Sequence, residues 1–214
     1  MDIRSLKENL INEYKYRIEL HAHTSGASAC SQITPEEMAK IYHSLGYDGI
    51  VITNHFTYRD NRDKNEYIKK YIYDYEIAKQ VGEDLGLTVL LGAEIRFTEN
   101  ANDYLIYGVD ESVLSSIYGL LPYGVENFRR ELKLEDSVFL QAHPFRDGMQ
   151  VVDSELLDGI EIYNMHPGHN SRVGLASRFA RAKSSLYKVI STEPTGTFIP
   201  SNPSIFLAIL SANG

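Results

Sequence analysis

Two histidines separated by one residue, His21 and His23, follow a strand-like run at residues 17–20. In an extended strand, the side chains at positions i and i+2 point to the same face and lie about 7 Å apart along the backbone. Two imidazoles on one face, where a strand gives way to a loop, form half of a site for a divalent metal. The spacing therefore predicts metal chemistry at this strand end.

Three later strand-like runs also end in a residue of a metal-ligating type. Residues 49–55 end in His55, residues 89–94 end in Glu94, and residues 138–143 end in His143. In a β/α barrel the carboxyl ends of the strands meet on one face of the molecule. Imidazoles suit zinc, manganese and iron, and a carboxylate such as Glu94 can bridge two cations. Two such cations can activate water for displacement at phosphorus.

Two arginines near these ligands are candidates for holding a phosphate. Arg96 lies two residues after Glu94 and shares its face of the strand, and Arg146 follows His143 by three residues. A guanidinium can hold a phosphate through two parallel hydrogen bonds. For each arginine the alternative role is an ordinary surface salt bridge.

The elements that must position these residues alternate between strands and helices, which indicates an α/β protein with a mainly parallel sheet. Seven strands are predicted, one fewer than in an ordinary TIM barrel. These strands cover residues 17–20, 49–55, 88–95, 104–109, 137–142, 159–163 and 187–190. Helices are predicted at residues 3–14, 34–45, 64–85 and 171–182, the second opened by a capping box.

Length, composition and charge limit the classes to which this protein can belong. A chain of 214 residues is interpreted as a single domain, residues 1–214, and no apolar run is long enough to span a membrane. One cysteine and no signal-like N-terminus predict a reducing, cytoplasmic compartment. The net charge of −8 disfavours nucleic acid as a partner and leaves a small phosphorylated substrate open. The oligomeric state does not follow from the sequence.

Taken in order, these residues resemble the PHP (polymerase and histidinol phosphatase) family. The similarity runs from about residue 17 to residue 163 and rests on the segments 19–24, 48–55, 92–95 and 142–144. It implies a distorted seven-stranded, TIM-like (β/α)7 barrel with two or three divalent metal ions, which would be zinc, manganese or iron. It also implies a phosphoesterase in which a metal-bound hydroxide attacks the phosphate.

The resemblance also implies roles for individual residues. His21, His23 and Glu94 match the ligands of one metal, Glu94 and His143 match those of a second, and His55 matches a ligand of the third. The residues expected to take part in catalysis are Glu94, His143, Arg146 and Arg96.

The chain departs from the family pattern at several positions. Asn54 stands where the family usually has the aspartate of a Thr-Asp-His motif. A further ligand would fall near residues 28–30, where only Cys30 could bind metal; we expect Cys30 to be a buried or semi-buried thiol, with metal ligation as the alternative. A histidine expected after the fourth strand is replaced by Asp110, which is retained as a candidate ligand.

The late Asp-x-His motif of the family is the largest departure. Glu193 can take the place of the aspartate as a metal ligand, whereas Thr195 does not match the histidine. His166 and His169 lie in a loop after the sixth strand, which suits either an exposed turn or a contact with substrate. The apolar segment 204–210 is expected to dock on the barrel.

Two other functions are compatible with these residues. An amidohydrolase-type metal hydrolase also opens with an H-x-H motif on a barrel, but no lysine ends a strand in this sequence to bridge its metals. The altered late motif is compatible with a degenerate domain that binds metal or a partner without turnover.

Overall fold

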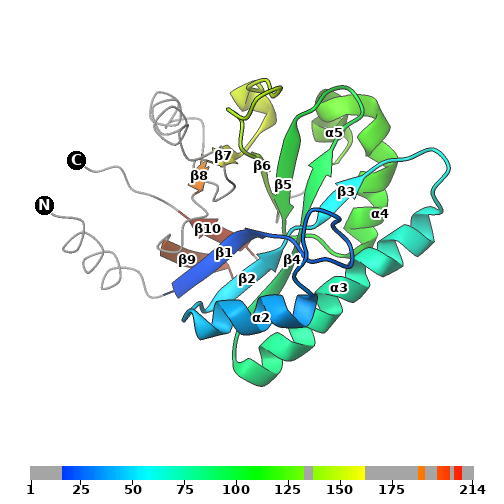
Figure 1. Ribbon diagram of the computed structural model, residues 1–214. Coiled ribbons are helices and arrows are strands. Elements are labelled where there is room, and N and C mark those ends of the chain that lie inside the picture. The colour runs from blue at the N-terminus through cyan, green and yellow to red at the C-terminus, as the bar shows by residue number, and fades with distance from the viewer. Residues whose placement is uncertain (1–15, 133–136, 162–187, 191–196, 203–204, 209–214) are drawn as a thin grey trace, which may run out of the picture.

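The computed structural model describes residues 16–132, 137–161, 188–190, 197–202 and 205–208. In these parts of the chain the strands form one curled sheet in the order β10-β9-β1-β2-β4-β5-β6-β7-β8, and β3 also pairs with β4 (Figure 1). The fold is therefore a mixed α/β fold with a sheet curved into a half-barrel. The predicted helices at residues 3–14 and 171–182 lie outside the described residues.

The first half of the sheet is parallel and is built from alternating strands and helices. Parallel pairing joins β1 (Tyr16–Ala22) to β2 (Gly49–Ile52) and β2 to β4 (Thr88–Arg96), and β3 (His55–Thr57) runs parallel to β4. Two helices, α2 (Pro35–Ser44) and α3 (Lys64–Leu85), lie side by side along these strands (Figure 1).

Local sequence signals fix the ends of both helices. The Thr34 hydroxyl accepts a hydrogen bond from the Glu37 N–H, and the Glu37 carboxylate accepts one from the Thr34 N–H, which confirms the predicted capping box. Gly86 ends α3 in the left-handed conformation with φ 77°, which glycine adopts without a steric penalty.

The second half of the sheet contains a reversed strand. Antiparallel pairing joins β5 (Asp103–Tyr107) to both β4 and β6 (Val138–Gln141), whereas β7 (Gly159–Glu161) and β8 (Lys188–Ile190) continue parallel to β6. The prediction of a mainly parallel sheet did not include this reversal. Between β5 and β6 lie α4 (Glu111–Leu120), the short helix η1 (Leu121–Tyr123) and α5 (Gly124–Glu131).

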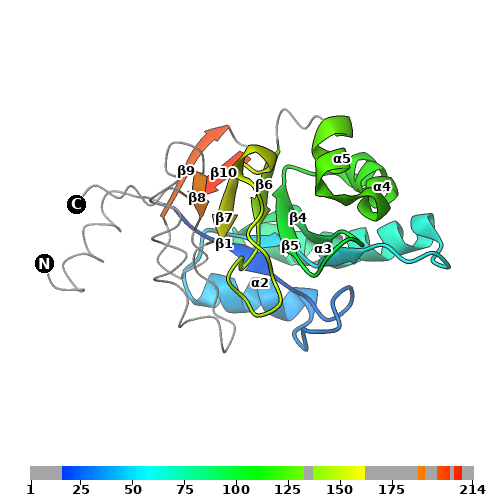
Figure 2. The same cartoon turned by 90° about the horizontal axis from the view of Figure 1, so that it is seen from above.

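Helices α4 and α5 lie on the opposite side of the molecule from β8, β9 and β10 (Figure 2). The short helix η2 (Ser154–Leu156) precedes β7, and the last two strands are β9 (Thr197–Asn202) and β10 (Ile205–Ala208). These two strands pair with each other, and β9 pairs antiparallel with β1. Each of the seven predicted strands overlaps an observed strand, while β9 and β10 were not predicted.

Alternation along the strands divides the buried side chains into an outer and an inner set. On β5, Tyr104 and Ile106 pack in the cluster that includes α4 and α5, whereas Leu105 and Tyr107 belong to the cluster inside the curl of the sheet. Because side chains alternate with a period of two, Asp103 also faces inward, as does every second residue of the neighbouring strands. The inner face therefore carries both an apolar floor and the polar residues described below.

The pairing of β1 is irregular around the first histidine of the H-x-H pair. The pairing of β1 with β2 shifts register between Glu19 and Ala22. The freed N–H groups of Leu20 and His21 both donate to Glu19 Oε1 at 3.0 Å, and the Tyr42 hydroxyl donates to Glu19 Oε2. Burial raises the pKa of Glu19 to about 7 despite these hydrogen bonds.

Within the described residues, no helix is long and apolar enough to cross a membrane.

Candidate metal centre

The carboxyl ends of four strands bring the candidate ligands to one edge of the sheet. His21 and His23 lie at the end of β1, His55 follows the end of β2 and begins β3, Glu94 lies near the end of β4, and His143 follows β6. Because β5 is antiparallel to both β4 and β6, these two strands run in the same direction and end at the same edge. This topology collects ligands from segments more than a hundred residues apart.

Glu94 lies at the centre of the group, and each of its oxygens faces two imidazoles. Its side chain is 1% exposed. The first oxygen, Oε1, lies 2.9 Å from His143 Nε2 and 3.4 Å from His21 Nε2. The second oxygen, Oε2, lies 2.8 Å from His55 Nδ1 and 3.2 Å from His23 Nε2. This is the arrangement of a carboxylate that bridges two cations.

A divalent cation fits this set of donors. Glu94 Oε2 is buried and has no hydrogen-bond partner among the described residues, although a buried acceptor left unsatisfied costs about 1–3 kcal/mol. Groups of three ligand atoms lie within 4.8 Å of one another. These groups are His21, His23 and Glu94; Glu94, Asp103 and His143; and His23, Cys30 and His55.

The charges of the group oppose the effect of burial. Burial disfavours the ionised form of Glu94, yet the charge of His21 and hydrogen bonds from His143 and His21 to Oε1 hold the pKa of Glu94 well below its usual range. Burial also disfavours protonated His21, but Glu161 and Glu94 raise the pKa of His21 well above its ordinary value. Binding of a cation at His21 would compete with its protonation.

Glu161 is a member of the site that the sequence analysis missed. This buried residue on β7 accepts a hydrogen bond from the His143 N–H at 2.8 Å through Oε2, and its Oε1 lies 2.9 Å from His21 Nδ1. His143 has a positive φ of 29°, so the Glu161 hydrogen bond supports an uncommon backbone conformation. The signal in the sequence was a carboxylate in the otherwise apolar strand β7. Because Ile160 packs on the outer face, the alternation of side chains turns Glu161 to the inner face.

Asp103 is the second missed residue, and it engages one of the predicted arginines. Arg96 forms a bidentate ion pair with Asp103, with Nε–Oδ1 and Nη2–Oδ2 distances of 2.6 and 2.7 Å. Asp103 Oδ2 also lies 3.9 Å from His143 Nε2. Arg96 therefore lies on the face of β4 that carries Glu94, as predicted, but its guanidinium is paired with a carboxylate.

Asp110 lies away from the cluster, so the structure corrects its interpretation as a candidate ligand. Its carboxylate caps α4 by accepting hydrogen bonds from the Val113 N–H and the Ser112 hydroxyl. The reversed direction of β5 is the physical reason: the residues that follow this strand emerge at the edge opposite Glu94, whereas Asp103 at its start lies beside the site.

We expect Asp110→Ala to lower the free energy of unfolding by about 1 kcal/mol, which is the usual effect of losing an N-cap. The hydrogen bond from Val113 lowers the pKa of Asp110, so the cap stabilises the fold at neutral pH and this stabilisation is lost as the pH falls through that pKa. Urea unfolding and metal analysis of the variant check this. A loss of bound metal would restore Asp110 as a ligand.

The structure describes the predicted arginine after His143, but not the late motif or the two histidines of the loop after the sixth predicted strand. Arg146 is exposed in the loop after β6, where its N–H donates to the His143 carbonyl oxygen at 2.9 Å. Glu193, Thr195, His166 and His169 lie outside the described residues.

Asn54, which replaces the aspartate of the family motif, has a positioning role. Its Oδ1 accepts a hydrogen bond from the Thr24 N–H and its Nδ2 donates to Thr24 Oγ1, both at 2.7 Å. The Thr24 hydroxyl in turn donates to Asp74 Oδ2 at 2.6 Å. This buried network ties the loop after β1 to α3. Gly26 is required there because a Cβ would collide with the Asp74 carboxylate.

The same loop places Cys30 beside the histidines. Cys30 Sγ lies 3.0 Å from His23 Nδ1, and this hydrogen bond lowers the pKa of the thiol. The expectation of a buried or semi-buried thiol was wrong, because Cys30 is exposed at the mouth of the cluster.

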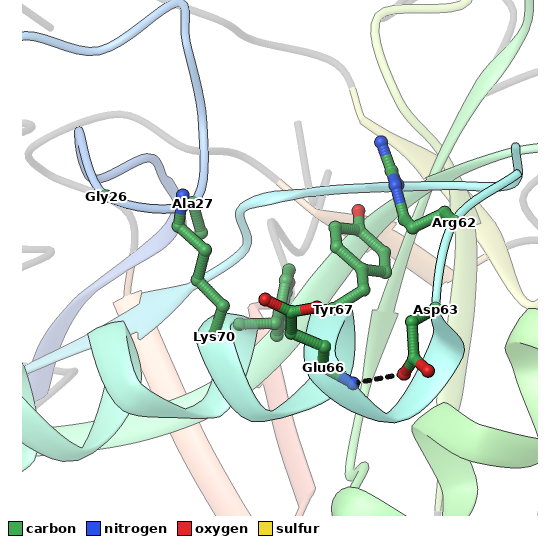
Figure 3. Close-up of a pocket in the computed structure, with 8 residues that line it drawn as sticks. Gly26, Ala27, Arg62, Asp63, Glu66, Tyr67 and Lys70 are labelled. Atoms are coloured by element: carbon green, nitrogen blue, oxygen red, sulfur yellow. Dashed lines mark hydrogen bonds between the residues drawn. The ribbon is translucent and has the colours of Figure 1, made fainter.

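A pocket of about 320 Å³ lies next to the cluster, between this loop and the start of α3 (Figure 3). Arg62 stacks on Tyr67, with 3.9 Å from its Cζ to the ring centroid, and Lys70 extends toward Ala27. The Tyr67 hydroxyl donates to the His55 carbonyl oxygen at 3.0 Å. The pocket wall is therefore directly connected to a candidate ligand.

Comparisons with solved structures find the same fold in proteins named as metal-dependent phosphoesterases and in an amidohydrolase. A two-domain protein from Bacteroides vulgatus that contains a predicted PHP-like metal-dependent phosphoesterase matches with a TM-score of 0.56 and 16% identity. The match covers 82% of this chain and 50% of that protein, so the chain spans half the length of this neighbour. A candidate metal-dependent phosphoesterase from Bifidobacterium adolescentis matches with a TM-score of 0.52 and 15% identity, over 91% of this chain and 93% of the other.

A third structure, an amidohydrolase from Chromobacterium violaceum with bound sulfate and no metal, matches with a TM-score of 0.52 and 13% identity. This match covers 82% of the chain and 86% of the amidohydrolase. No protein-family model matches the chain, and no curated protein matches it in sequence. The chain thus shares its fold with proteins named PHP-like phosphoesterases, in agreement with the resemblance found in its sequence.

Proposed function

We propose that this chain is a metal-dependent phosphoesterase that hydrolyses a small phosphate ester. The observation that carries the proposal is the buried Glu94 carboxylate, each oxygen of which faces two imidazoles within 3.4 Å. The named phosphoesterases with the same fold support it. We also propose that the curled sheet belongs to a distorted seven-stranded barrel.

In this proposal the histidines hold two or three divalent cations of zinc, manganese or iron. His21, His23 and Glu94 bind the first cation, Glu94 and His143 the second, and His55 belongs to a third. When bound, the cations supply an activated water and neutralise the charge of the phosphate. Glu161 orients the His21 ring through Nδ1, as the hydrogen-bonded partners of metal ligands usually do, and holds the backbone of His143 through its N–H.

The phosphate ester would lie at the open edge of the sheet, with its leaving group in the pocket beside α3. Arg146 is exposed in the loop after His143 and is the arginine we assign to the phosphate, because Arg96 is paired with Asp103. The pocket is lined by two cationic side chains, Arg62 and Lys70, and by two carboxylates, Asp63 and Glu66. A polar leaving group suits these surroundings better than an apolar one.

The first test is the metal content of the full chain, purified without a histidine tag or chelator. We expect about two or more equivalents of metal per chain, and hydrolysis of p-nitrophenyl phosphate after supplementation with manganese or zinc. One equivalent or none, unchanged by soaking in either metal, would support a non-catalytic domain instead.

A second candidate function is amide or lactone hydrolysis, favoured by the amidohydrolase of the same fold. A panel of phosphate esters, amides and lactones, assayed with the same metal-loaded protein, separates the two functions. Turnover of amides or lactones without turnover of phosphate esters would reverse our ranking.

A further inference from the structure

We propose that Asp74 on α3 is a positioning residue that holds two of the imidazoles, His23 and His55, in the metal centre. The inference rests on the proposed function, because it concerns the same cations, and it names a residue that acts on them through other side chains. The two imidazoles and the Glu94 oxygen that faces them, Oε2, are called the α3 side of the centre below.

The Asp74 carboxylate is buried and receives two hydrogen bonds from the loop after β1. The residue is 4% exposed. Its Oδ2 accepts one hydrogen bond from the Thr24 hydroxyl at 2.6 Å and another from the Ala27 N–H at 2.9 Å. Burying a carboxylate costs free energy unless hydrogen bonds compensate for the lost hydration. These two contacts provide that compensation and fix the loop to α3.

The carboxylate sets the direction of the hydrogen bonds that follow. Because a carboxylate only accepts, the Thr24 hydroxyl donates to Asp74 and uses its own oxygen to accept from Asn54 Nδ2. The Asn54 Oδ1 then accepts the Thr24 N–H. Thr24 directly follows His23 in the chain. Asn54 directly precedes His55, so the arrangement sets the backbone beside both imidazoles.

Asn54 also connects the two histidines to Glu94. Its carbonyl oxygen accepts hydrogen bonds from the Glu94 N–H at 3.1 Å and from the Tyr71 hydroxyl at 2.8 Å. Tyr71 lies one helical turn before the carboxylate, on the same face of α3. Glu94 Oε2 in turn lies 2.8 Å from His55 Nδ1 and 3.2 Å from His23 Nε2. The hydrogen bonds therefore lead from α3 to every member of the α3 side.

The other half of the centre contacts different elements. The His143 Nε2 lies 2.9 Å from Glu94 Oε1, and the His143 N–H donates to Glu161 on β7. His21 also contacts Glu161, through Nδ1. Loss of the Asp74 carboxylate is therefore expected to weaken binding of a cation on the α3 side and to spare binding beside His143.

Asp74→Asn tests the inference. The amide oxygen can still accept hydrogen bonds, but the amide also donates, so the direction of the Thr24 hydroxyl is no longer fixed. Equilibrium dialysis of the metal-free full chain against manganese, and separately against zinc, followed by elemental analysis measures the affinities. We expect one cation to bind about 10-fold more weakly and another to bind as in the wild type. Asp84→Asn makes the same change at an exposed position of α3 and should match the wild type.

Further variants identify which cation is affected and by what route. In His143→Ala, the cation that still binds reports on the α3 side, and adding Asp74→Asn should weaken it about 10-fold. Thr24→Val lacks the hydroxyl, so it is expected to lose affinity as Asp74→Asn does. Thr24→Ser keeps the hydroxyl and should bind metal more tightly than Thr24→Val.

The outcomes separate this inference from the proposed function. Unchanged affinities in a folded Asp74→Asn, or an equal loss of all cations together with a lower urea midpoint, would overturn the inference. Where Asp74→Asn does not fold, equal affinities in Thr24→Val and Thr24→Ser would overturn it. In each case hydrolysis of a phosphate ester by the wild type would leave the proposed function standing.

The reverse outcome is equally distinct. A selective loss of affinity in Asp74→Asn, with no hydrolysis of phosphate esters by the metal-loaded wild type, would support the inference and overturn the proposed function. A wild-type chain that binds neither manganese nor zinc would overturn both.

Discussion

Glu94→Gln is expected to abolish metal retention and hydrolysis together. The amide is neutral, so it cannot balance the charge of two cations, and its NH₂ group would direct hydrogens at imidazoles that must present lone pairs to metal. We expect bound metal to fall from about two equivalents to less than one, and the rate to fall about 10³-fold. Elemental analysis and the rate of phosphate-ester hydrolysis measure the two effects.

The matched control is Glu155→Gln, which makes the same chemical change at an exposed position on η2. Its metal content and rate should equal those of the wild type. Full activity in Glu94→Gln would eliminate the proposed two-cation scheme. Loss of activity with metal content unchanged would mean that Glu94 acts on the substrate and not as the bridging ligand.

Glu161→Gln is expected to weaken metal binding about 10–100-fold while the protein stays folded. Glu161 now accepts hydrogen bonds with both oxygens, one toward His21 Nδ1 and one from the His143 N–H. An amide keeps one acceptor and turns an N–H donor toward the other partner, so one of the two ligands loses its support. Titration against a competing chelator measures the change in affinity.

The comparison with Glu155→Gln again removes the effect of losing one negative charge. An affinity equal to that of the wild type would show that packing alone orients His21 and His143. A variant that fails to fold would be replaced by Glu161→Asp, which keeps the charge and shortens the reach; it is expected to bind metal more weakly than the wild type and more tightly than Glu161→Gln.

The sequence alone located the four strand ends that carry the histidines and Glu94. This was possible because a ligand at the end of an apolar strand is a local pattern: a period-two run sets the face, and the next residue leaves the strand at its carboxyl end. The capping box at Thr34 and the glycine end of α3 are local in the same sense. The resemblance to PHP proteins followed from the order of these segments.

Other parts of the site depended on the direction and pairing of strands, which the local pattern does not contain. A run of apolar residues gives the same pattern whichever way the strand runs. Because β5 is antiparallel to β4, the edge that holds Glu94 carries Asp103 at the start of β5 and not Asp110 after its end. The pairing of the last strands with β1 was likewise not evident from their residues.

The partners of the ligands were also decided by the tertiary structure. Glu161 reaches His21, which lies 140 residues earlier in the chain, and Asn54 meets Thr24, whose hydroxyl in turn donates to Asp74 on α3. Spacing in the sequence predicts which side chains share a face of one element, but a hydrogen bond between elements depends on how those elements pack. The sequence therefore predicted the kind of site, and the packing of the sheet determined which carboxylates lie beside the histidines.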